Sequence, residues 1–242
     1  MKKNRPDRNI SPDDVEKILV LKTWHASFFV LPVAKKLILF FSNNRRLTPN
    51  QITLAALFFR ISAAILFLFS SHMYMIAGGI SYYMAYLFDC VDGSVARLTN
   101  QASELGRYLD HVSDLAGDLL ILLSLAYSQN ILFTFTIYGM AFFHIAESYI
   151  SYLAGFALKS NKISIDSGIM NLFNKYRKWW FDRNYKSFIS FPDYTFFVFI
   201  IMPILGMPKN GLKIGFFFLS VIVLYTMLST FASLHTTEKR FP

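Results

Sequence analysis

The stretch from Asp89 to Asp114, DCVDGSVARLTNQASELGRYLDHVSD, sets four aspartates between two apolar runs, SYYMAYLF before it and LLILLSLAY after it. Ionisable groups close to the end of a membrane-spanning helix are costly to bury, so such a cluster predicts a functional site. No equal number of cations accompanies Asp89, Asp92, Asp110 and Asp114 in this stretch. This excess of carboxylates favours a bound divalent cation, and oxygen ligands favour Mg²⁺, Mn²⁺ or Ca²⁺ over softer metals.

The spacing of the aspartates predicts how they meet. Asp89 and Asp92 are three residues apart, Asp110 and Asp114 are four apart, and each pair therefore shares one face of a helix. If one helix ends near residue 97 and the next begins near 106, the two pairs meet at adjacent ends of antiparallel helices. Two metal ions held there would clamp a pyrophosphate and the attacking oxygen. Asp118 extends the second face by one turn.

The composition predicts a membrane protein. The 242 residues are 54% hydrophobic, with mean hydropathy +0.39, and apolar runs reach the length that crosses a bilayer, roughly 20 helical residues. The single cysteine, Cys90, excludes an intrachain disulfide. The N-terminal stretch is polar for too long to predict a secretory signal, which favours a cytosolic segment.

The net charge of +9 does not predict nucleic-acid binding, because of where the cations lie. Of 24 Lys and Arg, 10 precede residue 48 and 7 lie between residues 158 and 192. Such an asymmetry follows the positive-inside rule and predicts an inner or cytoplasmic membrane location with both termini and the aspartates facing the cytosol. A basic cytosolic face also attracts anionic lipid headgroups.

We therefore expect an all-α integral membrane fold with six transmembrane helices and an N-terminal juxtamembrane amphipathic helix over residues 15–42. The three expected segments are a cytosolic part with the surface helix (1–47), a membrane domain (48–235) and a cytosolic tail (236–242). Aromatic residues mixed with cations over 159–192 are typical of an interfacial segment. The predicted spans are 50–71, 74–97, 107–128, 131–158, 193–207 and 212–235. Thr48 and Pro49 suit the N-cap and first turn of the first span.

The central stretch reads D-x2-D-G-x2-A-R-x8-G-x3-D-x3-D with every position filled. This string resembles the signature of the CDP-alcohol phosphotransferases, also called CDP-alcohol phosphatidyltransferases, and LTPNQIT resembles the entry to their first span. The resemblance covers the motif firmly and residues 48–235 loosely. It does not account for the first 47 residues or for 159–192.

The resemblance implies a metal-dependent transferase that moves a substituted phosphate group from a CDP-alcohol to an acceptor alcohol and releases CMP. It implies Mg²⁺ or Mn²⁺, with two ions expected, a role in phospholipid or related phosphodiester biosynthesis, and a homodimer. By position it assigns metal binding to Asp89, Asp92, Asp110 and Asp114. Asp114 also corresponds to the general base, and the CDP pocket is assigned to Gly93, Ala96, Arg97 and Gly106. Asn50 lies at the same depth as the aspartates and is a further candidate for this pocket.

The donor and acceptor stay open at this point. CDP-diacylglycerol and a small CDP-polyol or CDP-amine both fit the motif. In the fourth span His144, Ser148 and Tyr152 share a face and Glu147 lies beside it. This pattern suits either a site for a polyol or amine acceptor, or a structural polar cluster that is neutral or paired with Arg60. The alternative function is a non-catalytic membrane transporter that uses the acids for cation movement. Acids at helix ends, away from the bilayer midplane, argue against it.

Overall fold

The structure of the chain is a computed structural model. It describes residues 9–19, 22–44, 47–159, 175–176, 178–186 and 188–238, with the backbone alone for 154–159 and 232–238. These residues form helices and connecting turns, with one isolated bridge between Lys22 and Tyr185 and no strand among them. The all-helical fold is therefore confirmed for the part of the chain that is described.

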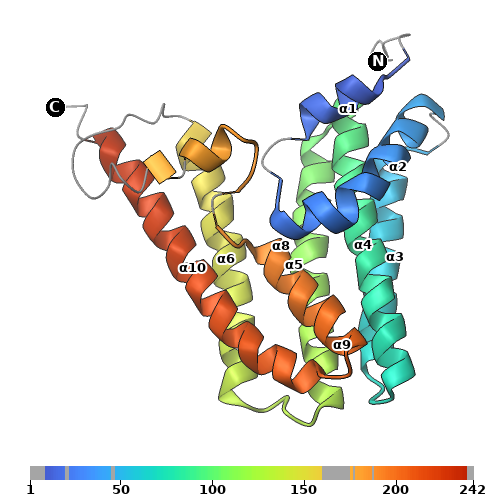
Figure 1. The fold of residues 1–242 in the computed structure, drawn as a ribbon, viewed down its shortest axis with the longest axis vertical. Helices are drawn as coiled ribbons and strands as arrows, with labels where there is room; N and C mark the ends of the chain where they lie inside the picture. Colours follow the sequence, from blue (N-terminus) through green and yellow to red (C-terminus); the bar gives the residue numbers. More distant parts are fainter. Residues whose placement is uncertain are drawn as a thin grey trace.

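Five long helices build the body of the molecule, and shorter ones pack against them (Figure 1). In chain order the elements are α1 (Pro12–Ile18), η1 (Ala26–Val30), α2 (Leu31–Asn44), α3 (Pro49–Phe67), α4 (His72–Leu98), α5 (Glu104–Ser128), α6 (Phe135–Lys159), α8 (Phe191–Phe196), η2 (Phe197–Ile201), α9 (Met202–Ile204) and α10 (Pro208–Glu238). A helix covers most of each of the six ranges expected to cross the membrane.

By length and composition, three helical stretches among the described residues are able to cross a membrane: Ala26–Asn44, Pro49–Phe67 and Pro208–Phe231. A shorter apolar helix runs over Phe191–Ile204. The count of six spans stays a prediction. The continuous surface helix expected over residues 15–42 is wrong, because Lys22 and Thr23 are not helical and separate α1 from the helix that follows. That second helix is apolar enough to be a span itself.

Two clusters of buried apolar side chains hold the helices together. The larger joins α3, α4, α5, α6, η2 and α10 through residues such as Phe67, Tyr82, Leu125 and Phe199. The smaller packs α1 and α2 onto α4. In Figure 1, α6 and α10 lean away from α3 and α4 toward the end of the molecule where α1 lies. The helix bundle therefore opens at that end.

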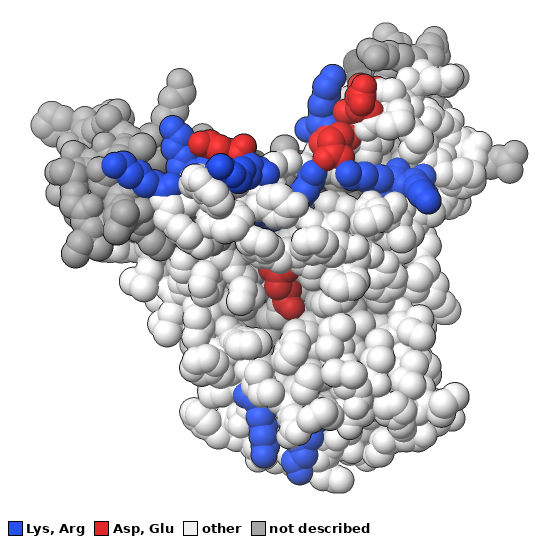
Figure 2. All heavy atoms as spheres, in the orientation of Figure 1, with Lys and Arg blue, Asp and Glu red and all other residues white. Residues whose placement is uncertain are grey.

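The surface has the character of a protein in lipid. Large apolar side chains such as Phe133 and Phe135 are more than 80% exposed. Figure 2 shows charged residues gathered at one end, a second small basic group at the other, and a mostly uncharged belt between them. A soluble protein rarely leaves so much contiguous apolar surface in water. Together with the apolar helices, this surface supports an integral membrane protein.

Local capping fixes the helix ends next to the aspartates. Thr48 is the N-cap of α3, with a capping box to Gln51 and Pro49 in the first turn, as expected. Ser103 caps α5 by accepting a hydrogen bond from the Gly106 N–H at 3.0 Å. Because of this cap α5 begins at Glu104, two or three residues before the range predicted. The turn between α4 and α5 includes Asn100, which adopts a left-handed φ of 55°.

Candidate active site

Three of the predicted acids converge at one point. Asp89 and Asp92 extend from α4 and Asp110 from α5, and one carboxylate oxygen from each lies within 4.8 Å of the others. Among the described residues, no salt bridge involves any of the three. Asp92 accepts a hydrogen bond from the Thr53 hydroxyl at 2.5 Å, which orients its side chain. The helix ends therefore meet as the spacing predicts.

This donor set fits a hard divalent cation. Three carboxylates so close together repel one another, and no cation among the described residues forms a salt bridge with them. Carboxylate oxygens from two rigid helices, with room for further ligands, are the arrangement that Mg²⁺ and Mn²⁺ prefer. Binding a cation would remove the repulsion and fix the separation of α4 and α5.

Asp114 occupies a different environment from the other three aspartates. It forms an ion pair with Arg60 of α3. The Nε atom of Arg60 also lies 3.5 Å from Asp118 Oδ1, and the Tyr82 hydroxyl donates a hydrogen bond to the Asp118 carboxylate at 3.0 Å. Arg60 and Asp118 are almost completely buried. The guanidinium therefore serves as counter-ion for the two acids one and two turns beyond Asp110. It does not pair with Glu147, so the alternative in which these two form a structural pair is wrong.

The position of Arg60 depends on Gly117. A Cβ atom added at Gly117 would lie 2.0 Å from Arg60 Cδ. Since α3 and α5 pack closely, only glycine leaves room for the arginine stem between them. Gly117 and the roles of Arg60 and Thr53 were not predicted from the sequence. The sequence does contain a pattern that indicates a role for Thr53, because Thr53 follows Asn50 by three residues and lies on the same helix face.

A cavity of about 420 Å³ opens on one side of the carboxylate cluster. All five residues predicted for the CDP pocket line it, together with Asp92 and Asp110: Asn50, Gly93, Ala96, Arg97 and Gly106. Arg97 is exposed and donates a hydrogen bond from its guanidinium to the Ser94 hydroxyl at 3.3 Å. The rest of the polar lining consists of Thr53, Gln101, Ser103, Glu104 and Arg107.

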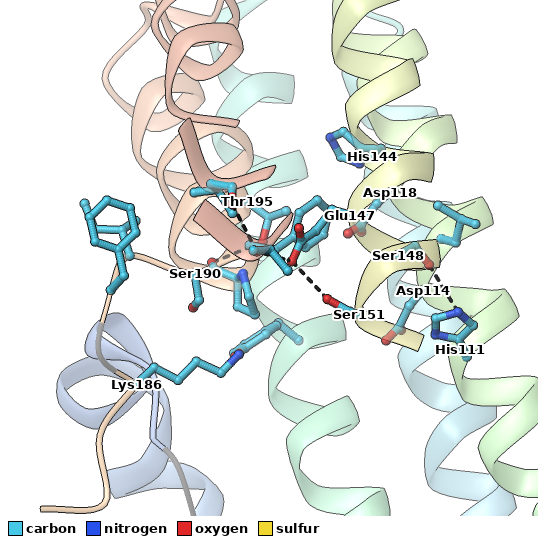
Figure 3. Close-up of a pocket in the computed structure, with 18 of the residues that line it drawn as sticks. His111, Asp114, Asp118, His144, Glu147, Ser148, Ser151, Lys186, Ser190 and Thr195 are labelled. Atoms are coloured by element: carbon cyan, nitrogen blue, oxygen red, sulfur yellow. Dashed lines mark hydrogen bonds between the residues drawn. The ribbon is translucent and has the colours of Figure 1, made fainter. Parts of the chain in front are cut away.

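A second cavity, of about 500 Å³, lies on the other side and is shown in Figure 3. Asp89 and Asp114 face it, so the carboxylate cluster separates the two cavities. The remaining polar lining comes from all five long helices, from α8 and from the segment before α8. Figure 3 shows His111 and Ser148 on one side and Lys186 and Ser190 on the other.

Of the polar residues singled out on α6, His144, Glu147 and Ser148 line this second cavity, and Tyr152 does not. Glu147 accepts hydrogen bonds from Ser151 at 3.0 Å and from Thr226 of α10 at 3.3 Å. Ser148 pairs with His111 at 3.1 Å. His144 is fully buried, and its Nε2 forms a hydrogen bond with the Tyr194 hydroxyl at 3.0 Å.

Tyr152 stacks on His111 with ring centroids 5.4 Å apart and stays largely exposed. The first part of the interfacial segment predicted over 159–192, namely residues 160–174, lies outside the described residues. Its described end does more than anchor the chain, because Lys186 and Phe188 to Pro192 line the second cavity. Backbone hydrogen bonds join Lys22 to Asn184 at 2.8 Å and to Lys186 at 3.0 Å. No local sequence pattern predicted this contact between the N-terminal segment and the cavity wall.

A model of the CDP-alcohol phosphatidyltransferase family matches residues 46–231, which is most of the chain. The chain belongs to the CDP-alcohol phosphatidyltransferase family. This membership places it among transferases of phospholipid biosynthesis. The matched residues include α3, α4 and α5, which contribute to the walls of both cavities.

One curated relative of this family is the CDP-diacylglycerol–inositol 3-phosphatidyltransferase of Drosophila melanogaster, which is 39% identical over 79 residues. The match covers 33% of this chain and only 34% of the fly protein. This short match leaves the acceptor and the activity of the whole chain open.

Solved structures of the Mycobacterium tuberculosis phosphatidylinositol phosphate synthase share the fold. One, with CDP-DAG bound, has a TM-score of 0.53 and 20% identity, over 88% of this chain and 97% of that one. A second, in complex with manganese and citrate, has a TM-score of 0.53 and 18% identity, over 88% and 92%. At this identity the likeness shows a common fold alone.

Proposed function

We propose that the chain transfers the phosphatidyl group of CDP-diacylglycerol to a hydroxyl of a small acceptor, with release of CMP. The observation that carries the proposal is the carboxylate cluster between two cavities. A transferase needs a donor site and an acceptor site that meet at the reacting phosphorus. The fly relative's name and the donor bound in the mycobacterial structure support CDP-diacylglycerol as the donor.

We assign the CDP moiety to the smaller cavity. Gly93, Ala96 and Gly106 leave space next to the helix backbones, and Asn50 presents an amide there. Arg97 is placed to bind a phosphate through two N–H groups. The acyl chains would then extend into the bilayer along the apolar helix surface.

Asp89, Asp92 and Asp110 would hold the metal, Mg²⁺ or Mn²⁺. When bound, the ions neutralise the pyrophosphate and stabilise the charge that develops on the leaving CMP. The manganese found in a mycobacterial structure agrees with this donor set. The protein's own contribution is to hold three acids and the CDP group in one orientation.

Asp114 is the proposed general base, and its position on the acceptor side of the cluster supports this role. It accepts the proton of the acceptor hydroxyl as the new O–P bond forms to the phosphatidyl phosphorus. The bond from that phosphorus to the CMP oxygen breaks, and CMP leaves with the electron pair. Arg60 keeps Asp114 oriented. Asp114 lies outside the converging group of three, so we assign it a smaller part in metal binding than the other three aspartates.

The test is CMP release from purified protein in detergent, with CDP-diacylglycerol, a panel of acceptor alcohols and Mg²⁺ or Mn²⁺. We expect release that requires both an acceptor and the metal, and that stops on chelation. Ion movement in proteoliposomes without CMP release would instead establish the transporter alternative.

We also propose that the end of the molecule toward which α6 and α10 diverge from α3 and α4, where α1 lies, faces the cytosol. We further propose that two copies of the chain form a dimer. A cysteine introduced at Ser70 should react with an impermeant reagent from outside, and one introduced at Gln101 from inside alone. The reverse pattern would overturn the orientation. Crosslinking in native membranes tests the dimer.

A further inference from the structure

The charges around the larger cavity restrict what it is able to bind, and the following argument rests on the proposed function of that cavity as the acceptor site. Four acids line it, namely Asp89, Asp114, Asp118 and Glu147, against the two cations Arg60 and Lys186. Arg60 is already engaged by Asp114 and Asp118. Away from the carboxylate cluster, Glu147 and Lys186 are therefore the charged groups left to meet an acceptor.

Glu147 has one oxygen that lacks a partner. Its Oε1 accepts from Ser151 and Thr226, whereas Oε2 is buried with no hydrogen-bond partner among the described residues. The residue is only 8% exposed. A buried carboxylate oxygen without a donor is costly, so a bound group that donates a hydrogen bond there would be favoured.

Lys186 approaches the cavity from the segment before α8 (Figure 3). It forms no salt bridge with any residue that the structure describes. Burial lowers the pKa of Lys186, while the negative charges of Asp193 and Glu147 act to raise it. The backbone hydrogen bonds between Lys22 and residues 184 and 186 fix where this side chain starts. Lys186 thus offers N–H donors on the wall formed by the segment before α8.

The neutral lining offers acceptors more than donors, because several hydroxyl protons are used within the protein. Ser151 donates to Glu147, Ser190 donates to Asp193 at 2.7 Å, and Thr195 donates to the Pro192 carbonyl at 3.1 Å. The single proton of the Thr226 hydroxyl is shared between Glu147 at 3.3 Å and the Ile222 carbonyl at 3.0 Å. Each of these hydroxyls keeps lone pairs for a ligand. A ligand rich in O–H groups therefore matches the lining best.

We infer that the acceptor is an uncharged, unphosphorylated polyol whose hydroxyls donate to Glu147 and to the hydroxyl oxygens of the lining and accept from Lys186. A phosphorylated polyol brings an anion next to Glu147, Asp114 and Asp118. An amino alcohol brings a cation next to Lys186. An amino acid brings a further carboxylate into a lining that already holds four acids against two cations. Hydroxyl groups both donate and accept, so a polyol satisfies both charged residues at once.

The first experiment measures kcat/KM for CMP release with CDP-diacylglycerol fixed and the acceptor varied. The probes are myo-inositol and glycerol, their monophosphates, ethanolamine and L-serine. We expect a neutral polyol to exceed its own monophosphate and both amines by at least ~30-fold, because apposed like charges and unpaired polar groups are strongly disfavoured. Preference for a phosphate ester or for either amine overturns the inference while leaving the proposed function intact. No CMP release with any acceptor would instead refute the proposed function.

The second experiment asks whether Glu147 and Lys186 set this preference. Glu147→Gln should raise the KM of the polyol by ~10-fold, leave the KM of CDP-diacylglycerol unchanged, and reduce discrimination against the polyol phosphate by a similar factor. Lys186→Met should raise the same KM and reduce discrimination against ethanolamine. Matched controls are Asp13→Asn and Lys213→Met, which change exposed charges outside the cavity. If both cavity variants lose activity with unchanged acceptor ratios, the two residues have a structural role and the inference fails.

Discussion

The two cavities on either side of the carboxylate cluster differ in how the chain builds them. The smaller one comes from α3, α4, α5 and the turn between α4 and α5, all within residues 49–110. The larger one takes its lining from all five long helices and from residues between 181 and 195, a segment that is joined to Lys22. The first is set by local spacing, and the second by contacts between distant segments. A family signature is therefore able to specify the donor side while the acceptor side varies.

Loss of an acid at the boundary should affect both cavities, and it is the largest effect we expect. Asp89→Asn or Asp110→Asn should reduce CMP release by at least ~1,000-fold, because the metal supplies several kcal/mol of transition-state stabilisation. The measurement is CMP release, alongside chromatographic evidence that the variant is folded in detergent. Full release by Asp89→Asn would remove the metal assignment.

Asp114→Asn should separate the two sides. The variant keeps the side-chain volume and a carbonyl oxygen, so donor affinity should stay close to that of the wild type while turnover falls by ~100-fold. Asp92→Asn, which lines the smaller cavity, should weaken donor and metal binding together. Nucleotide affinity and turnover are measured on both variants. If Asp114→Asn loses donor binding as completely as Asp92→Asn does, Asp114 is a metal ligand and the base lies elsewhere.

Arg97→Ala should affect the donor side alone. Loss of a charge-assisted contact to phosphate should raise the KM of CDP-diacylglycerol by roughly 10-fold. The KM of the acceptor should not change, because Arg97 does not line the larger cavity. Initial-rate kinetics with each substrate varied in turn provide the measurement. An equal rise in both KM values would argue against separate sites.

The difference between the cavities also explains what the sequence was able to predict. The meeting of Asp89 and Asp92 with Asp110, and the lining of the smaller cavity, follow from residue spacing within three consecutive helices. The ion pair of Arg60 with Asp114 and Asp118 depends on the packing of α3 on α5, and a Cβ at Gly117 would prevent it. Lys186 reaches the larger cavity through a contact with a residue more than 160 positions earlier, which periodicity cannot indicate.

Arg60→Met tests whether the ion-pair network supports the shared wall of the site. Removing the guanidinium leaves the buried Asp118 without its counter-ion, which should lower stability by about 3 kcal/mol. Gly117→Ala should act in the same direction, since its Cβ displaces the arginine. The matched control is Arg107→Met, whose guanidinium is exposed and pairs with the exposed Glu104, with an expected change below about 1 kcal/mol. Thermal unfolding in detergent gives the comparison. An unchanged Arg60→Met would show that the network contributes no net stability.

The smallest effect is expected at the N-terminal segment, which supports the larger cavity from outside. Glu16 lies 2.5 Å from both Lys22 Nζ and Lys35 Nζ, and their hydrogen bonds, that of Lys22 first, lower the pKa of Glu16 below its ordinary value of 4.5. A lowered pKa in the folded state means that the stabilisation is complete above pH 4.5 and is lost as the pH falls through the lower value. Because Glu16 is about half exposed, the contribution should be a few tenths of a kcal/mol.

Glu16→Gln should therefore unfold at a slightly lower temperature than the wild type near neutral pH, and the difference should vanish once the pH falls below the lowered pKa of Glu16. Since Lys22 is joined through its backbone to Lys186, the same variant should raise the KM of the acceptor by at most ~2-fold and leave the KM of the donor unchanged. Thermal unfolding from pH 3.5 to 7 and initial-rate kinetics provide the two measurements. A larger rise in the KM of the donor than in the KM of the acceptor would mean that the N-terminal segment supports the signature helices and not the acceptor wall. The two cavities would then be less independent of each other than their linings indicate.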